Sequence, residues 1–274
     1  MRVYISADIE GIGCIVRQEQ SSPGGREFAW ARKMMTEEVN AAAKGAFDGG
    51  ATGVVVADSH NVGLNLIPED LDERVSIVMG SPRPLSMMEG VDAGFDAAFL
   101  VGYHGMAGTA DSTIAHIFMG RIAEVRVNDF PIGEIGISAA LAGHYSVPVA
   151  MVTGDENTVA EAVKLLDGIE TVEVKKGIGA YAALCLPPKR SRTLIYEGAR
   201  RAMSRKKDWH PFRFEGEVDL RVRFTTASAA DRALHIPGVE RVNGRTVRFL
   251  ASDFIEAFRA FNTMADLMDL VKFI

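Results

Sequence analysis

The chain is poor in cysteine, in tryptophan, in long apolar runs and in clustered positive charge. Only two of its 274 residues are cysteines and only two are tryptophans. Cys14 and Cys185 stand far apart and lack the spacing of a metal site, so we expect two small, buried, reduced side chains in a cytoplasmic protein. A small scaffold held together by disulfides is thereby excluded.

The charge and hydropathy of the chain argue against nucleic acid as a partner and against a membrane segment. Lys and Arg number 30 against 36 Asp and Glu, which gives a net charge of −6. Nucleic acid is not expected as a partner, because phosphate binding needs a concentrated basic surface, and the only basic cluster (200–207) is the charged end of a predicted helix. No stretch approaches the roughly 18 apolar residues of a membrane span. Acidic residues also interrupt the first apolar run, so neither a membrane segment nor a signal peptide is predicted.

What the sequence does contain is an alternation of strand and helix patterns over its first 155 residues. Unbroken β-branched runs at 3–7, 53–57 and 97–102 are typical of strands buried on both faces. A helix is predicted at 26–48, ending at Gly49-Gly50. The pattern continues with strands at 121–128 and 147–152, a turn at 129–131, and helices at 133–144 and 157–166. We therefore predict the α/β class, with a mainly parallel sheet covered by helices on both faces.

The pattern changes after Leu186-Pro187-Pro188. The elements predicted beyond it are a basic helix, a half-exposed strand, a hairpin and an apolar-striped helix, at 190–207, 217–224, 239–250 and 252–270. The hairpin is expected to turn at Asn243-Gly244, a pair suited to type I′. We predict a catalytic, metal-binding α/β domain over 1–188 and a smaller α+β domain, for packing or oligomerisation, over 189–274.

Acids and histidines follow three of the predicted strands. Asp8 and Glu10 come after the first strand. His60 follows the second and His104 the third. The carboxyl ends of parallel strands share one edge of a sheet, where ligands usually bind, so these side chains should meet. Carboxylates side by side repel each other without a cation, and their combination with imidazole favours Zn, Mn, Fe or Co over Mg or Ca. Glu134, at the start of a predicted helix, is a fifth candidate.

Each candidate also has an ordinary structural explanation, such as helix capping, packing of a single histidine, or an acid in the first turn of a helix. Three acids and two histidines together exceed what one structural zinc requires. They suit two metals that share a carboxylate, about 3.5–4 Å apart, which can hold a hydroxide near neutral pH and stabilise an oxyanion. His116 has apolar neighbours, so it is either a packed histidine or a proton carrier or oxyanion partner.

Seven short motifs lie in order along the chain. They are Ser6-Ala7-Asp8-Ile9-Glu10-Gly11-Ile12, Met35-Thr36-Glu37-Glu38-Val39-Asn40, Asp58-Ser59-His60, Met87-Met88-Glu89-Gly90, Gly102-Tyr103-His104, Val127-Asn128-Asp129 and Gly133-Glu134-Ile135-Gly136. The set resembles the D-aminopeptidases of the DppA family, which are binuclear zinc, self-compartmentalising bacterial peptidases. The resemblance covers essentially the whole chain.

This resemblance implies a zinc-dependent aminopeptidase, a hydrolase of short peptides whose N-terminal residue is D-configured. Asp8 would bridge two zinc ions in each subunit. Glu10 and His60 would complete the protein ligands of one ion. His104 and Glu134 would complete those of the other.

The resemblance also bears on His116 and on assembly. His116 falls where the family keeps a histidine implicated in catalysis, and the family implies a ring-built homodecamer that encloses its active sites. Another metal-dependent amidohydrolase or phosphatase, or a non-catalytic zinc-binding protein, stays open as an alternative. Aromatic residues of the tail either pack within their own chain or form subunit contacts: Phe249, Phe254, Phe258, Phe261 and Phe273.

Overall fold

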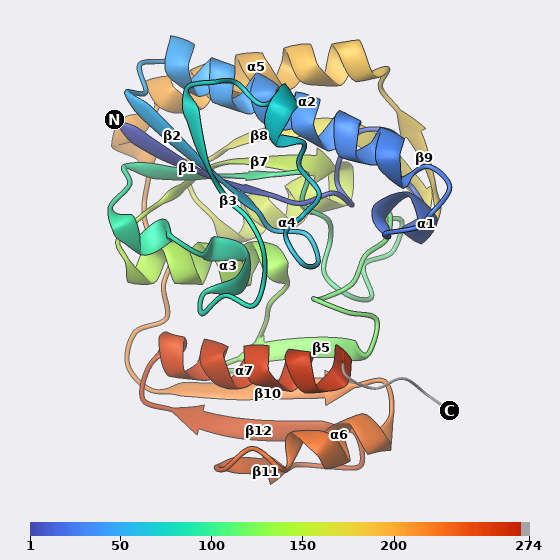
Figure 1. Cartoon of the computed structure of the whole chain (residues 1–274). Coiled ribbons are helices and arrows are strands. Elements are labelled where there is room, and N and C mark those ends of the chain that lie inside the picture. The colour runs from blue at the N-terminus through green and yellow to red at the C-terminus, as the bar shows by residue number, and fades with distance from the viewer. Residues whose placement is uncertain (270–274) are drawn as a thin grey trace.

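The computed structural model describes residues 1–269 and contains two sheets (Figure 1). The larger sheet has seven strands in the order β3-β2-β1-β4-β7-β8-β9. They are β1 (Arg2–Ala7), β2 (Gly53–Asp58), β3 (Val75–Val78), β4 (Ala97–Val101), β7 (Val149–Asp155), β8 (Glu170–Gly179) and β9 (Ala182–Cys185). Only β9 pairs antiparallel, so the predicted α/β class with a mainly parallel sheet is confirmed.

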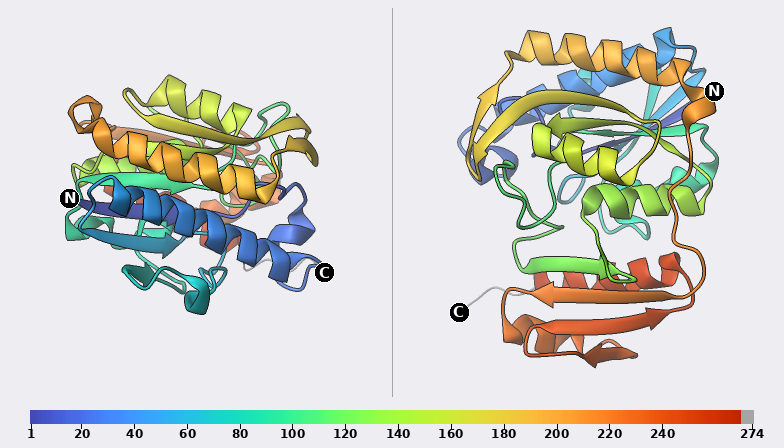
Figure 2. Two further views of the ribbon diagram at one scale, coloured as in Figure 1. Left: turned by 90° about the horizontal axis from the view of Figure 1, so that it is seen from above. Right: turned by 180° about the vertical axis from the view of Figure 1, so that it is seen from behind.

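Helices cover both faces of this sheet. On one face α2 (Phe28–Asp48) and α5 (Pro188–Ser204) run side by side, and the short α1 (Gln18–Ser21) precedes α2 (Figure 2, left). The other face carries α3 (Glu134–His144) and α4 (Glu156–Leu165). Val3 and Ile5 of β1 pack in the core under α2, and Tyr4 packs in the core on the opposite face. Burial on both faces explains the unbroken apolar runs of the central strands.

The smaller sheet is antiparallel and has the order β11-β12-β10-β5-β6. Its strands are β5 (Ile122–Val127), β6 (Phe130–Pro131), β10 (Val218–Phe224), β11 (Val239–Arg241) and β12 (Thr246–Ala251). Two helices belong to this layer, α6 (Ala227–Ala233) and α7 (Phe254–Asp269), and α7 lies between the small sheet and α3 (Figure 1).

The two sheets divide the chain differently from the predicted ranges 1–188 and 189–274. The helix α5 packs on α2 of the first layer, where Gly45 allows a close approach, because a Cβ there would lie 2.4 Å from the Tyr196 carbonyl oxygen. The strands β5 and β6, although they precede residue 188, belong to the small sheet, where β5 pairs with β10 on one side and with β6 on the other. A division at 188/189 into folding units stays a prediction.

The predicted hairpin at 239–250 is present, but its type I′ turn is wrong. Neither Asn243 nor Gly244 has the positive φ that type I′ requires. Instead the Asn243 side chain accepts hydrogen bonds from the backbone N–H groups of Arg245 and Thr246, both at 3.0 Å, and closes a longer loop. Positive φ at two central residues occurs between β5 and β6, at Asn128 (51°) and Asp129 (63°).

The aromatic stripe of the tail packs within its own chain. Phe254, Phe258 and Phe261 are buried in the core that α7 shares with the small sheet, and Phe249 packs partly buried against it. Phe273 lies outside the described residues. Within residues 1–269, no helix is long and apolar enough to cross a membrane.

Candidate metal centre

The carboxyl edge of the large sheet brings together the five predicted ligands. Asp8 and Glu10 follow β1, and His60 follows β2. His104 follows β4, and Glu134 begins α3, whose N-terminus points at the same edge. All five side chains are buried. Side chains from distant parts of the sequence thus converge as the strand pattern predicts.

The first group of contacts surrounds His60. Its Nδ1 lies 3.1 Å from Asp8 Oδ1 and 2.9 Å from Glu10 Oε2. Its Nε2 lies 2.7 Å from the carbonyl oxygen of Ser21. A carbonyl can only accept, so Nε2 carries the hydrogen and Nδ1 can present a lone pair to a cation held by the two carboxylates.

The second group surrounds His104. Its Nε2 lies 3.5 Å from Asp8 Oδ2 and 3.3 Å from Glu134 Oε2. Its Nδ1 donates to the carbonyl oxygen of Gly105 at 3.0 Å, which leaves Nε2 free for a cation. Asp8 therefore directs one carboxylate oxygen to each histidine, as a bridging ligand would.

His116 comes from the loop between β4 and β5. Its ring stacks on that of His104, with ring centroids 4.2 Å apart, and its Nε2 lies 3.9 Å from Glu134 Oε1. Its Nδ1 donates to the carbonyl oxygen of Ile114 at 2.8 Å. Burial lowers the pKa of His116, and the neighbouring His104 lowers it further, which favours a neutral ring that can take up a proton.

The electrostatics show an excess of buried negative charge. Burial, reinforced by Glu10, raises the pKa of Asp8 to about 7. Burial opposes a charged His104, but Glu134 and Asp8 raise its pKa to about 10. Asp8 Oδ2, both oxygens of Glu10 and His104 Nε2 are buried without a hydrogen-bond partner in the described structure. Such atoms destabilise a protein unless something binds them, and a shared cation would do so.

The ligand atoms fall into two compact sets. In one set Asp8, Glu10 and His104 lie within 4.8 Å of one another, and in the other His104, His116 and Glu134 do. His60 stands beside the first set through its contacts with both acids. Mixed imidazole and carboxylate donors in this arrangement fit two transition-metal ions.

Asp155, at the carboxyl end of β7, is a site residue that the strand pattern could have revealed. Its carboxylate accepts from Ser112 Oγ (2.9 Å), from Thr113 N–H (2.8 Å) and, as the N-cap of α4, from Thr158 N–H (2.9 Å). Ser112 Oγ also accepts from Gly105 N–H at 3.2 Å. Asp155 therefore holds the loop of His116 and, through Ser112, the loop of His104.

A cavity of about 570 Å³ opens above the acids and histidines. Both layers line it, since Asn262 and Ala265 come from α7 and Tyr181 from the connection between β8 and β9. Phe118 and Met119 add apolar walls near His116. The cavity is large enough for a short peptide and places it against the site.

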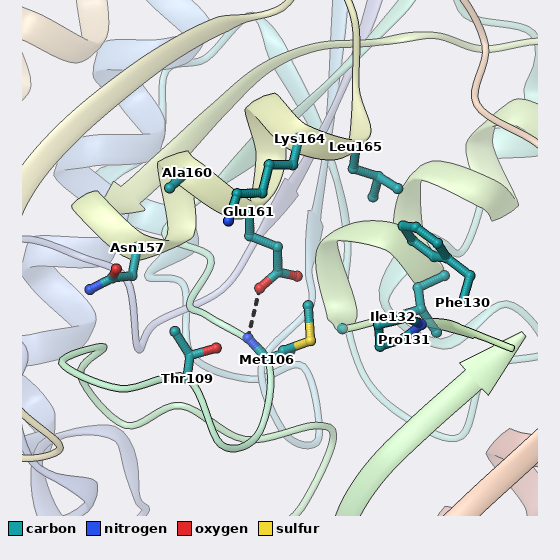
Figure 3. Close-up of a pocket in the computed structure, with 11 residues that line it drawn as sticks. Met106, Thr109, Phe130, Pro131, Ile132, Asn157, Ala160, Glu161, Lys164 and Leu165 are labelled. Carbon is teal, nitrogen blue, oxygen red and sulfur yellow. Dashed lines mark hydrogen bonds between the residues drawn. The ribbon is translucent and has the colours of Figure 1, made fainter.

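A second cavity, of about 270 Å³, lies beside the loop that follows His104 (Figure 3). Its walls are mostly apolar, with Phe130 at one side, and none of the predicted ligands lines it. Glu161 reaches into it from α4, and its Oε2 accepts from the Met106 backbone N–H at 2.8 Å. Burial raises the pKa of Glu161 to about 7.

Comparisons with known proteins agree over the whole chain. A family model described as D-aminopeptidase matches residues 1–263. The D-aminopeptidase of Bacillus subtilis (strain 168) is 35% identical over 268 residues, which is 97% of each chain. Among solved structures, the Zn-dependent D-aminopeptidase DppA from Bacillus subtilis, a self-compartmentalizing protease, matches with a TM-score of 0.97 and 34% identity, covering 100% of both chains.

Proposed function

The chain belongs to the D-aminopeptidase family, and we propose that it hydrolyses short peptides with a free D-configured N-terminal residue by means of two zinc ions. Zinc is supported by the similar solved enzyme, which is zinc-dependent. The observation that carries the proposal is the buried cluster at the sheet edge, whose carboxylate and imidazole atoms lack partners. The cavity of about 570 Å³ beside this cluster would hold a short peptide against the bound ions.

We assign the ligands as the family resemblance and the contacts suggest. Asp8 would bridge the two ions. Glu10 and His60 would hold one ion, and His104 and Glu134 the other. When bound, the zinc ions would activate a water molecule and polarise the scissile carbonyl.

The remaining chemistry belongs to the chain itself. The carbonyls of Ser21 and Gly105 fix the rings of His60 and His104, so that their free nitrogens face the carboxylates. His116 is held flat against His104 with Nε2 directed at Glu134, where it can accept a proton and return it to the leaving amine. The apolar walls of the cavity would exclude bulk water and orient the peptide.

Assembly forms part of the proposal. The similar solved enzyme is self-compartmentalizing, and we propose that this chain also forms a closed homo-oligomer, a decamer by family resemblance. A cytoplasmic location is supported by Cys14 and Cys185, which are both free thiols, although they are partly exposed and not buried as expected.

The decisive experiment combines metal analysis with substrate profiling of the purified protein. We expect about two zinc ions per chain and cleavage of D-Ala p-nitroanilide and short D-peptides, faster than of the L-Ala compounds. A chelator should abolish the activity and added zinc should restore it. Hydrolysis of phosphate esters without cleavage of any amide would refute the proposal, and so would inactivity of the fully metallated protein.

A further inference from the structure

A buried lysine holds the loop that carries Glu10. Lys175 lies on β8 with 1% of its surface exposed. Its Nζ donates to the backbone carbonyl oxygens of Glu10 (2.6 Å), Ile12 (3.1 Å) and Ile15 (2.5 Å). All three donor positions of the ammonium group are therefore used by one short loop.

A buried glutamate holds the same loop from another element. Glu38 of α2 is 2% exposed, and its Oε1 accepts from Gly13 N–H at 3.1 Å and from Ser191 Oγ at 2.9 Å. A Cβ at Gly13 would lie 2.9 Å from that oxygen, so a larger residue there would displace the Glu38 carboxylate from this bond. Lys175 thus binds three carbonyl groups of the loop, and Glu38 binds one N–H group that lies between them in the sequence.

The loop is also locked to the neighbouring ligand loop. Gly11 N–H donates to the Gly102 carbonyl oxygen at 2.7 Å, and a Cβ at Gly11 would lie 1.8 Å from the Tyr103 carbonyl oxygen. The backbone next to Glu10 therefore rests on the segment that leads to His104. A shift of the loop would move Glu10 relative to both groups of ligands.

Stability alone does not account for a buried ammonium here. Taking a charged group out of water is costly, and an apolar side chain of similar volume often serves the fold as well or better. Three carbonyl acceptors around one nitrogen require three N–H donors, which the protonated ammonium group supplies. An ammonium group can hold three carbonyl groups in one geometry, whereas a methionine side chain, which has no hydrogen-bond donor, cannot.

We propose that Lys175 and Glu38 act as positioning residues that hold the Glu10 carboxylate in place for metal binding. The inference rests on the metal site of the proposed function. Neither side chain lines the cavity, so each acts through the loop and neither touches substrate. Precise placement of ligands by such supporting bonds is typically worth 10–100-fold in metal affinity.

The test is zinc binding by the full chain, measured by competition with a chromophoric chelator. Lys175→Met should lower the zinc affinity of the site at Glu10 by about 10–100-fold, while the site at His104 and Glu134 should still bind its ion. The matched control is Lys176→Met, because Lys176 is the next residue on the same strand and its side chain is 61% exposed. That control should bind zinc as the wild type does.

A second pair of variants tests Glu38, the other proposed positioning residue. Glu38→Ala removes the acceptor for Gly13 and should weaken zinc binding, whereas Glu38→Gln keeps an acceptor oxygen and should restore wild-type affinity. Should Lys175→Met fail to fold, the Glu38 pair decides. Wild-type zinc affinity in folded Lys175→Met or in Glu38→Ala, with only a lower Tm of the metal-free protein, would overturn the proposal.

These readouts separate the two proposals. If the wild-type protein bound zinc but cleaved no peptide, the proposed function would be refuted. The zinc titrations of the variants would still test the positioning role of Lys175 and Glu38. If the wild-type protein were an active peptidase and its Glu38→Ala variant bound zinc normally, only the positioning role would be refuted.

Discussion

Three histidines around the site each give one ring nitrogen to a backbone carbonyl. The acceptors are Ser21 for His60, Gly105 for His104 and Ile114 for His116, at 2.7–3.0 Å. This arrangement sets the tautomer and the ring plane before any ligand arrives. The sequence predicts His60 and His104 from their places after strands and His116 through the family resemblance, but the carbonyl partners depend on loop conformations that no local pattern specifies.

Loss of a ligand histidine should remove metal. His60→Ala or His104→Ala should lower the affinity for zinc by about 10–100-fold or more and abolish turnover. The far-UV circular dichroism should be unchanged. His144→Ala is the control, because His144 is exposed at the end of α3. If either ligand variant kept full zinc content and rate, that histidine would not be a ligand.

His116 should behave differently from the ligands. His116→Ala should keep both zinc ions and lose roughly 10²–10⁴-fold in kcat, because it removes a proton-transferring group and leaves the assigned ligands in place. Metal analysis and steady-state kinetics on the same sample check this. Unchanged kcat in the metallated variant would make His116 a packed side chain only.

Glu161 should make stability depend on pH. Its folded pKa of about 7 exceeds the ordinary 4.5, so the folded state binds a proton that the unfolded state releases, and stability falls as pH rises between these values. Glu161→Gln keeps an acceptor for Met106 and removes this dependence. The variant should match the wild type near pH 4 and exceed it by up to about 3 kcal/mol above pH 7. Urea unfolding in EDTA measures the difference, and a constant difference from pH 4 to 8 would contradict the assignment.

At the scale of elements, a residue that caps a helix can also hold a loop of the site. Asp155 caps α4 and holds the loop of His116. Thr226 instead caps α6 by accepting from Ala229 N–H, and its hydroxyl shares a hydrogen bond with the hydroxyl of neighbouring Ser228. Thr226→Ala should cost about 1 kcal/mol of unfolding free energy with normal kcat. Asp155→Ala should cost more and also lower kcat. Thermal unfolding and kinetics compare the two, and equal kcat in both would separate Asp155 from the site.

The predictability of the elements follows their burial. The central strands β1, β2, β4 and β7 were predictable because both faces are covered and the runs are unbroken. The outer strands β8 and β9 were not, because polar positions such as Lys176 interrupt the apolar run of β8, and β9 has only four residues. Lys175 therefore gave no signal, since a lysine in an unpredicted strand looks like a surface residue.

At the scale of the whole molecule, the site is a joint product of two layers. The ligands come from the large sheet and α3, while α7 of the small layer closes one side of the cavity. The strand pattern predicts that Asp8, Glu10, His60 and His104 meet at one edge of the sheet, whereas Glu134 was a candidate from its place at the start of a helix. The cavity wall was not predictable, since it depends on β5 pairing with β10 in the small sheet.

The apolar surface that assembly would bury is not the stripe of α7, which packs inside its own chain. The β8–β9 hairpin instead carries Ile178, Tyr181 and Leu184, which are 69%, 57% and 67% exposed, and Tyr181 also lines the cavity. In Figure 2 (right) this hairpin projects from the body of the molecule. Contacts between copies are therefore expected to include it, close to the mouth of the cavity.

Light scattering coupled to gel filtration should show a closed homo-oligomer, with a decamer as the expected size. Ile178→Asp combined with Leu184→Asp should reduce the particle mass, because buried unpaired charge opposes association. Val163→Asp, at a 56% exposed position on α4, is the control and should leave the mass unchanged. An enclosed site admits only small substrates, so the oligomer should cleave dipeptides and spare long unfolded chains. A stable monomer that cleaves both equally well would refute the assembly and the size filter together.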